Sequence, residues 1–321
     1  MWSCKEIFSS PVDIEPSHLS NKGVIFGLLA NSDPRDSLFR EQIFTREKSI
    51  PGMGRRIFSS HSTHSNKGQQ KFHKAKISVR SEEKDLPLKY FDASMLPGSL
   101  DPFYGIMEEF TPGREYRLSA SCDTTDSSNG KKYWAPVSAL DTVPRSVSVI
   151  IEEAGIKYPD LKKYIAEGFM NIRIEDEPYI RNTYQLEIAV VQSHVDALGR
   201  KYDVVIPVIV DGGDDRVSSE VFGDYHHNLI HEAEFNRDGQ KKVNFTFHTN
   251  HGLFNKEKPV TLVIRFSNLS RHYAEFLNSS RRYFAMGENP FAEPAEIYSN
   301  IQNGYGIFAF AARSYDSYEV R

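Results

Sequence analysis

Short segments with the pattern of β-strands recur along the whole chain, and this recurrence constrains the fold more than any other feature. In the first half, residues 24–30 form a continuous apolar run, and residues 72–80 and 115–121 alternate between apolar and polar side chains. Turn-forming residues, mainly Gly, Pro and Asp, separate these segments. We therefore predict an all-β sandwich over residues 20–140, preceded by a separate N-terminal segment at residues 1–19.

The second half repeats the strand pattern and adds one helix. Strand-like segments occur at residues 170–174, 183–192, 202–210, 242–248 and 260–267. A helix is predicted over residues 271–286, because Ser270 is a good N-cap and apolar side chains then fall on one stripe. A shorter helix is predicted over residues 160–167. The chain closes with a strand at residues 305–312, so we predict a second β-sandwich over residues 145–321.

Composition and charge exclude several classes of protein. Hydrophobic residues make up 39% of the chain and aromatic residues 12%, which is enough for packed cores. The formal net charge of −4 gives no reason to expect a nucleic acid as a partner. No apolar run approaches the roughly 18 residues that a membrane-spanning helix needs. We therefore expect a folded, mainly β protein that does not bind nucleic acid.

A run of turn-forming and aromatic residues at 289–308 comes just before the end of the chain. Pro290 and Pro294 lack a backbone donor, so no helix continues through this run. Asn303-Gly304 predicts a turn that accepts a positive φ angle. Residues of this kind determine a shape, and we expect a structural role for Asn289, Pro290, Phe291, Pro294, Tyr298, Ser299, Asn300, Gly304, Gly306 and Phe308.

Histidines form the main group of candidate metal ligands. A cluster at residues 226–231 is followed by two more histidines, and the candidate zinc ligands are His227, His231, His248 and His251. The order His-Glu-x-x-His is absent, which excludes a zinc protease of that type. Acidic loops at residues 123–130 and 211–215 offer oxygen donors for calcium, although neither has the spacing of an EF-hand. Solvated histidines and plain turns are the alternative interpretation.

Sequence patterns typical of enzymes are missing. The chain has no nucleophile elbow, no phosphate-binding glycine loop and no dinucleotide fingerprint. Asp176 and Glu177 are adjacent, and neighbours on a strand point to opposite faces, so they cannot flank one scissile bond. We therefore expect that the protein is not an enzyme and uses no cofactor.

The two cysteines, Cys4 and Cys122, are too few for a disulfide framework or a four-cysteine zinc site. Cys122 is interpreted as a small buried hydrophobic residue. Cys4 follows a small residue, as does the lipid-carrying cysteine at the cleavage site of a bacterial lipoprotein signal. The hydrophobic segment of such a signal is not part of this sequence, so we expect that it lies upstream or has been removed. The alternative is an ordinary residue on a frayed terminus.

Several segments together are similar to one family. They are the run at residues 289–308, the helix before it, Phe235-Asn-Arg-Asp-Gly239, Ile174-Glu-Asp-Glu-Pro178 with Asn182-Thr-Tyr-Gln-Leu186, and Pro112-Gly-Arg-Glu-Tyr-Arg-Leu118. They resemble an outer-membrane and surface lipoprotein family of Bacteroidota, known as domain of unknown function 4249. Genes of this family commonly lie beside genes for TonB-dependent receptors.

The resemblance implies two β-sandwich domains, the first immunoglobulin-like or transthyretin-like, and an acylated cysteine at Cys4. It also implies a location on the outer membrane, anchored by lipid and facing the cell surface. We therefore expect a non-enzymatic accessory or binding subunit of an outer-membrane β-barrel, namely a TonB-dependent nutrient importer. The alternative is a secreted or periplasmic β-sandwich module that binds a metal or a carbohydrate.

Overall fold

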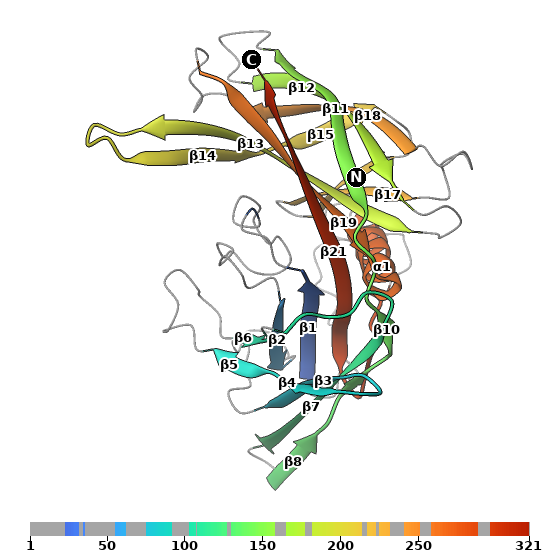
Figure 1. Cartoon of the computed structure of the whole chain (residues 1–321). Helices are drawn as coiled ribbons and strands as arrows, with labels where there is room; N and C mark the ends of the chain where they lie inside the picture. The colour runs from blue at the N-terminus through green and yellow to red at the C-terminus, as the bar shows by residue number, and fades with distance from the viewer. Residues whose placement is uncertain are drawn as a thin grey trace, which may run out of the picture.

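The computed structural model describes residues 23–31, 35, 55–61, 75–91, 103–106, 108–126, 130–157, 165–176, 182–213, 217–222, 225–231, 241–250, 258–287 and 296–320. Over these residues the fold is mainly β, with several sheets and one helix near the C-terminus, α1 (Arg271–Gly287) (Figure 1). The predicted fold class is confirmed, and the helix lies where its N-cap and apolar stripe place it.

The largest sheet contains ten strands within the described residues and runs through both halves of the molecule. Nine strands form the order β16 (Val217–Phe222), β17 (Tyr225–His231), β13 (Thr183–Val195), β19 (Val260–Leu269), β21 (Tyr305–Val320), β1 (Gly23–Ala30), β2 (Arg55–His61), β6 (Phe103–Gly105) and β5 (Lys89–Phe91). The tenth, β14 (Lys201–Pro207), pairs with β13. β1 and β21 are parallel neighbours, so strands from the two predicted sandwiches share one sheet.

Two smaller sheets pack against this large one. The four-stranded sheet has the order β11 (Ser148–Lys157), β12 (Ile165–Glu175), β18 (Lys241–Asn250) and β15 (Ile209–Gly213). The seven-stranded sheet has the order β20 (Ile301–Gln302), β9 (Val137–Ser138), β7 (Glu115–Asp126), β3 (Lys76–Arg80) and β4 (Asp85–Pro87), and both β10 (Asp141–Thr142) and β8 (Gly130–Trp134) pair with β7.

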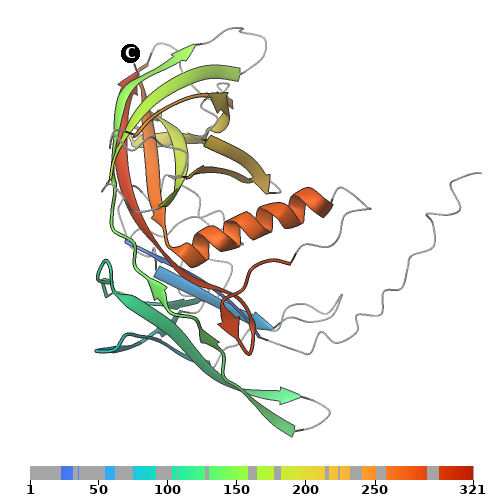
Figure 2. The same cartoon turned by 90° about the vertical axis from the view of Figure 1, so that its right-hand side faces the viewer.

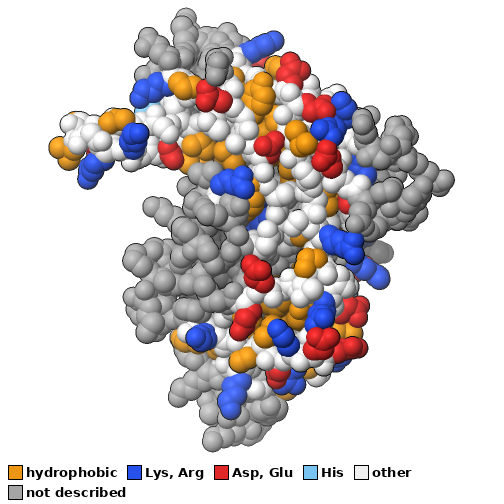
Figure 3. Space-filling view, viewed as in Figure 1, with side chains coloured by type: hydrophobic (Ala, Val, Ile, Leu, Met, Phe, Trp, Pro, Cys, Tyr) orange, Lys and Arg blue, Asp and Glu red, His pale blue; other side chains and the backbone are white. Residues whose placement is uncertain are grey.

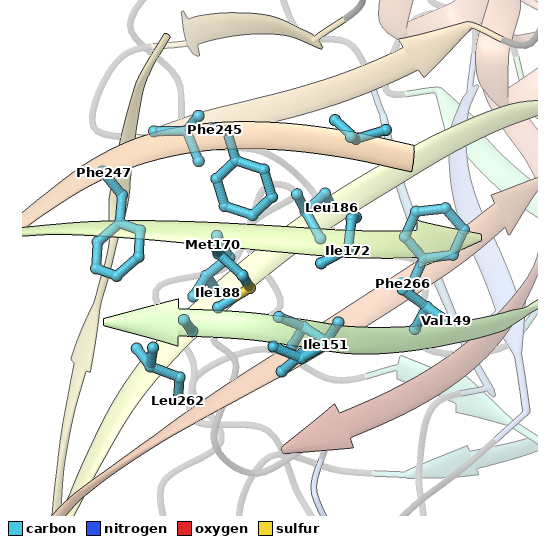
Figure 4. Close-up of a cluster of buried hydrophobic side chains, with 14 of the residues drawn as sticks. Val149, Ile151, Met170, Ile172, Leu186, Ile188, Phe245, Phe247, Leu262 and Phe266 are labelled. Carbon is cyan, nitrogen blue, oxygen red and sulfur yellow. The ribbon is translucent and has the colours of Figure 1, made fainter. Parts of the chain in front are cut away.

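The core of the second half lies between the four-stranded sheet and the large sheet. Alternating residues of the facing strands point into it, because side chains on a strand alternate between its two faces. Figure 4 shows these side chains meeting: Val149, Ile151, Met170, Ile172, Phe245 and Phe247 from the small sheet, and Leu186, Ile188, Leu262 and Phe266 from the large one. Burying apolar side chains of this size contributes about 1.5–3 kcal/mol each.

The long strand β21 connects all parts of the fold. Phe308 and Phe310 point into the core beneath the seven-stranded sheet, while Ile307 and Ala309 point to the opposite face and contact the helix cluster around Tyr273. Further along, the end of β21 packs against the core of the second half. Figure 2 shows α1 lying across one face of β21. One strand therefore contributes to both cores and to the surface against which α1 packs.

The structure corrects one predicted element and shows how the two halves of the chain are joined. The helix predicted over residues 160–167 is wrong for its last three residues, which begin strand β12, while residues 160–164 lie outside the described residues. Residues 165–174 form a strand and not a helix because they pair with β18. The segment between the two predicted sandwiches is packed against the first of them: Val143 is buried, and its N–H donates to the carbonyl of Arg114 at 3.0 Å.

Among the described residues, no helix combines the length and the apolar character that would be needed to cross a membrane.

Candidate functional site

A cavity of about 1180 Å³ opens where the two cores meet. Its walls are the first turns of α1, the segment at residues 142–146 between β10 and β11, and the adjoining ends of β12, β13 and β19. Binding sites for small molecules are typically clefts of about 300–1,000 Å³. The cavity is therefore large enough for an organic ligand, and it is built from residues of both halves.

Acidic and basic groups at the rim of the cavity are paired with each other. Arg173 contacts Glu175 and donates from Nε to Glu152 at 3.0 Å, and Arg271 donates from Nε to Glu275 at 2.8 Å. Burial raises the pKa of Glu275, but the hydrogen bonds of Arg271 and Tyr298 and the charges of Arg271 and His272 together outweigh burial, so the pKa is lowered overall. These groups therefore present hydrogen-bonding surfaces without a strong net charge.

One wall of the cavity contains a buried ionic group. Asp176 accepts hydrogen bonds from Asn182 Nδ2 at 2.6 Å and from the hydroxyl of Tyr184, and it lies 3.3 Å from Lys241 Nζ. The side chains of Lys241 and Asp176 are only 4% and 7% exposed. Lys241 Nζ also lies 3.2 Å from the hydroxyl of Tyr184. Such a group holds its members in fixed positions, because a buried charge without a partner is strongly unfavourable.

Asn268 offers an unused acceptor beside the cavity. Its Nδ2 donates to the carbonyl of Arg145 at 3.0 Å, while its buried Oδ1 has no hydrogen-bond partner among the described residues. Leaving a buried acceptor unpaired costs about 1–3 kcal/mol, so a ligand donor or a water that reaches this oxygen would be stabilised. Asn182 and Asn278 also line the cavity, which gives it three side-chain amides.

The segment beside the cavity is tied to the helix and to β21 by Asp141. The N–H of Phe310 donates both to Asp141 Oδ2, at 3.2 Å, and to Ser270 Oγ, at 3.1 Å. Burial raises the pKa of Asp141 to about 6, against the opposing effects of its hydrogen bond with Ser270 and the charge of His272. Asp141 is therefore an acid whose protonation favours the folded state.

We expect stability to depend on the protonation of Asp141. Its pKa is higher in the folded chain than the ordinary 3.8, so its stabilising effect is full below pH 4 and is lost as pH rises towards 6. The substitution Asp141→Asn should remove this dependence and raise stability at pH 7 by on the order of 2 kcal/mol. Urea unfolding of both proteins from pH 4 to pH 8 measures the free energy of unfolding at each pH. If that free energy depends on pH in the same way in both proteins, Asp141 is not the group responsible.

A hydrogen-bonded cluster lies on the helix next to Asp141. His272 Nδ1 is 2.5 Å from the hydroxyl of Tyr298, and Nε2 is 2.9 Å from the carbonyl oxygen of Leu140. The two rings stack at 5.8 Å. Burial and the nearby carboxylate of Glu275 raise the pKa of Tyr298 to about 12. Tyr298 therefore acts as a neutral hydrogen-bonding group that joins the C-terminal run to the helix.

The predicted metal ligands are only partly placed. The backbones of His227 and His231 lie in β17, where His227 is opposite Glu220, but their side chains and His251 lie outside the described residues. His248 Nδ1 contacts the carboxylate of Asp211. Within the described part of the chain, no three His, Cys, Asp or Glu side chains gather closely enough to hold a metal ion. The histidine site stays a prediction.

The C-terminal run serves the packing of β21. Asn300 is buried, its Nδ2 donates to the carbonyl of Phe308 at 2.7 Å, and its Oδ1 accepts the N–H of Phe308 at 2.9 Å. Asn303 has the positive φ angle that the sequence predicts, at 58°. Ser299 Oγ accepts from the N–H of Ile301, and Gly304 lies in the turn that leads into β21. Gly306 lies against β1.

Other predicted positions lie outside the described residues. They are Cys4 and the signature residues Asn289, Pro290, Phe291 and Pro294. The side chain of Cys122 is also outside them, while its backbone lies in β7.

Sequence reasoning missed Lys241 and Asn268 as residues of the site. A signal for both was present in the alternation of their strands. Lys241 lies two residues before the core residue Val243, and Asn268 lies two residues after the core residue Phe266, so both lie on the inward face. A polar residue in that position is buried and needs a partner. Alternation therefore marks Lys241 and Asn268 as polar side chains that point inward at the ends of their strands.

Comparisons with known proteins give one match. Residues 55–316 match the family model described as Domain of unknown function (DUF4249). No curated protein and no solved structure matches the chain. The matched range includes the cavity walls, the helix and most of β21. The chain therefore belongs to the family defined by the domain of unknown function DUF4249.

Proposed function

We propose that this protein is a non-enzymatic accessory subunit that binds a ligand or a partner for an outer-membrane β-barrel. In this proposal Cys4 carries a lipid, the protein sits on the outer membrane at the cell surface, and the barrel is a TonB-dependent nutrient importer. The observation that carries a binding role is the cavity of about 1180 Å³ between the two cores.

The chemistry of the cavity supports binding. Its carboxylates contact cations: Glu175 contacts Arg173, Asp176 contacts Lys241, and Glu275 contacts Arg271. A general base or nucleophile needs a carboxylate or hydroxyl poised to react, with a pKa matched to its task. Paired carboxylates and amides instead suit a site that recognises a ligand through hydrogen bonds.

The barrel partnership predicts co-purification from native membranes. Outer membranes solubilised in mild detergent, with the protein captured through a C-terminal tag, should yield a β-barrel protein in near-stoichiometric amount. Intact-mass measurement of the same preparation should show an acyl modification at Cys4, and Cys4→Ser should remove the added mass and reduce the amount of protein in the membrane fraction. Capture of the protein alone, with unmodified Cys4, would rule the proposal out.

A carbohydrate-binding module is the second candidate. The cavity is lined by Asn182, Asn268 and Asn278 together with hydroxyls of Ser146 and Thr183. Amide and hydroxyl groups match sugar hydroxyls, which donate and accept at the same time. Calorimetric titration with soluble oligosaccharides separates the two candidates, because saccharide binding without a co-purifying barrel favours the second.

A further inference from the structure

A hairpin made of β13 and β14 projects from the body of the molecule. β13 pairs with β19 only as far as Val191, whereas its pairing with β14 continues to Val195, opposite Lys201. The end of the hairpin therefore extends beyond the edge of the large sheet. Figure 1 shows the hairpin standing clear of the body, and Figure 3 shows hydrophobic and basic side chains at its end.

The turn at the end of this hairpin is held rigidly by Asp196. Its Oδ1 accepts the N–H groups of Leu198 and Arg200 at 2.8 and 2.9 Å, and its Oδ2 accepts from Arg200 Nε at 2.7 Å. Gly199 supplies the positive φ angle of 75° that the turn requires. The backbone N–H and then the guanidinium of Arg200 keep the pKa of Asp196 below its usual range.

The rigid turn presents apolar side chains to the solvent. Among the large hydrophobic residues that the structure describes as exposed, Leu198 at 77%, Val195 at 57% and Tyr202 at 50% are the three most exposed. All three lie within eight residues at the end of one hairpin. Single exposed apolar residues are ordinary, but a group held at a projecting tip marks a contact surface.

Charged and polar side chains lie beside these apolar residues at the end of the hairpin. Asp196 is neutralised by Arg200, and Lys201 is exposed with no ion-pair partner among the described residues. Tyr202 stacks on His194, and further back Ser193 donates to Asp203 at 2.7 Å. The tip therefore carries exposed apolar side chains, a neutralised ion pair in the turn, and an exposed lysine opposite Val195.

We propose that the end of the β13–β14 hairpin inserts into the interfacial region of a lipid bilayer. Leu198, in the turn, enters the acyl boundary, while Val195 and its register partner Lys201 lie with Tyr202 at the level of the headgroups. Tyrosine prefers this interface, and basic side chains extend from apolar stems towards phosphates. An apolar recess on a protein would accept Leu198 and Val195, but it gives no reason for the exposed Lys201 beside them.

This insertion rests on the proposed function, because a lipid on Cys4 would hold the chain at the same membrane. The hairpin would add a second contact with that membrane and would fix the orientation of the body above the bilayer.

The test uses the full chain without its lipid and vesicles of phosphatidylethanolamine and phosphatidylglycerol. We expect co-sedimentation that rises with lipid concentration, and Leu198→Asp should weaken the partition by about tenfold or more. The matched control is Ile297→Asp, since Ile297 is an exposed apolar residue, at 40%, on another part of the surface. This control should leave the partition unchanged.

The depth of residue 198 in the bilayer is measured with Leu198→Trp. The fluorescence emission of the new tryptophan should shift to the blue and should be quenched by lipids brominated along the acyl chain. Ile297→Trp should show neither change. Vesicle binding that is absent, or that is equally strong in Leu198→Asp, overturns the proposal. Loss of β-barrel co-purification in Leu198→Asp without any vesicle binding also overturns it, in favour of a protein recess. If the lipid-free chain binds vesicles but no barrel co-purifies, the insertion of the hairpin is supported and the proposed partnership with a barrel is not.

Discussion

Replacing Gly306 with alanine is expected to cost more than about 3 kcal/mol of stability, which is a large fraction of the total stability of a typical domain. Gly306 has a φ angle of 109°, and a Cβ atom added there would lie 1.8 Å from the backbone oxygen of Ile25. The clash falls on the parallel pairing of β1 with β21, where Ile25 and Gly306 are register partners. Backbone cannot move away as a flexible side chain can, so the strands would have to separate.

The matched control for this substitution is Gly199→Ala. Gly199 also has a positive φ angle, at 75°, but no atom lies within 4 Å of an added Cβ. Only the backbone strain of about 1 kcal/mol remains there. Urea unfolding followed by circular dichroism compares the two variants with the unmodified chain. Equal losses at both positions would show that backbone strain alone, and not close contact with β1, explains the need for Gly306.

Replacing Arg265 with methionine should destabilise the protein by about 3–5 kcal/mol, because it leaves a buried carboxylate without a partner. Arg265 and Glu187 are directly opposite on β19 and β13. The guanidinium makes two hydrogen bonds of 2.7 Å to Glu187, from Nε and from one terminal nitrogen. The two side chains are only 3% and 10% exposed.

A second substitution separates the cost of the orphaned charge from the value of the pair. Glu187→Leu combined with Arg265→Met should recover most of the lost stability, because neither buried group then carries a charge. The control is Arg271→Met, which removes a similar hydrogen bond to Glu275 at an exposed position and should cause no measurable change. Thermal unfolding by calorimetry resolves these differences. A double variant no more stable than Arg265→Met would refute the explanation by an orphaned charge.

Local patterns were sufficient to predict the class of the fold. Alternation over residues 242–248 corresponds to β18, and the cap and stripe after Ser270 correspond to α1. Both signals depend on neighbours in the sequence, since burial repeats with the period of each element. The closing strand was predicted over residues 305–312, but β21 continues to Val320, because pairing with the whole of β19 extends it.

Other features depend on contacts between distant residues. Arg265 and Glu187 look like solvent-facing positions of their strands, yet the fold buries both. Asp176, just after β12, meets Tyr184 of β13 and Lys241 of β18, and nothing in the spacing of these residues shows it. Phe308 and Phe310 lie far beyond the predicted boundary near residue 140, yet they pack into the core of the first half, and the large sheet contains strands from both halves.

The sequence by itself determined the mainly β class of the fold, the helix that follows Ser270 and the turn at Asn303, because each follows from local periodicity and local backbone preference. The resemblance of its segments also indicated the family to which the chain belongs. Tertiary structure alone decided that β1 pairs in parallel with β21, that Asn268 meets a cavity, and that the end of the β13–β14 hairpin stands free. These depend on which strands become neighbours, and pairing energies are shared among residues far apart in the chain.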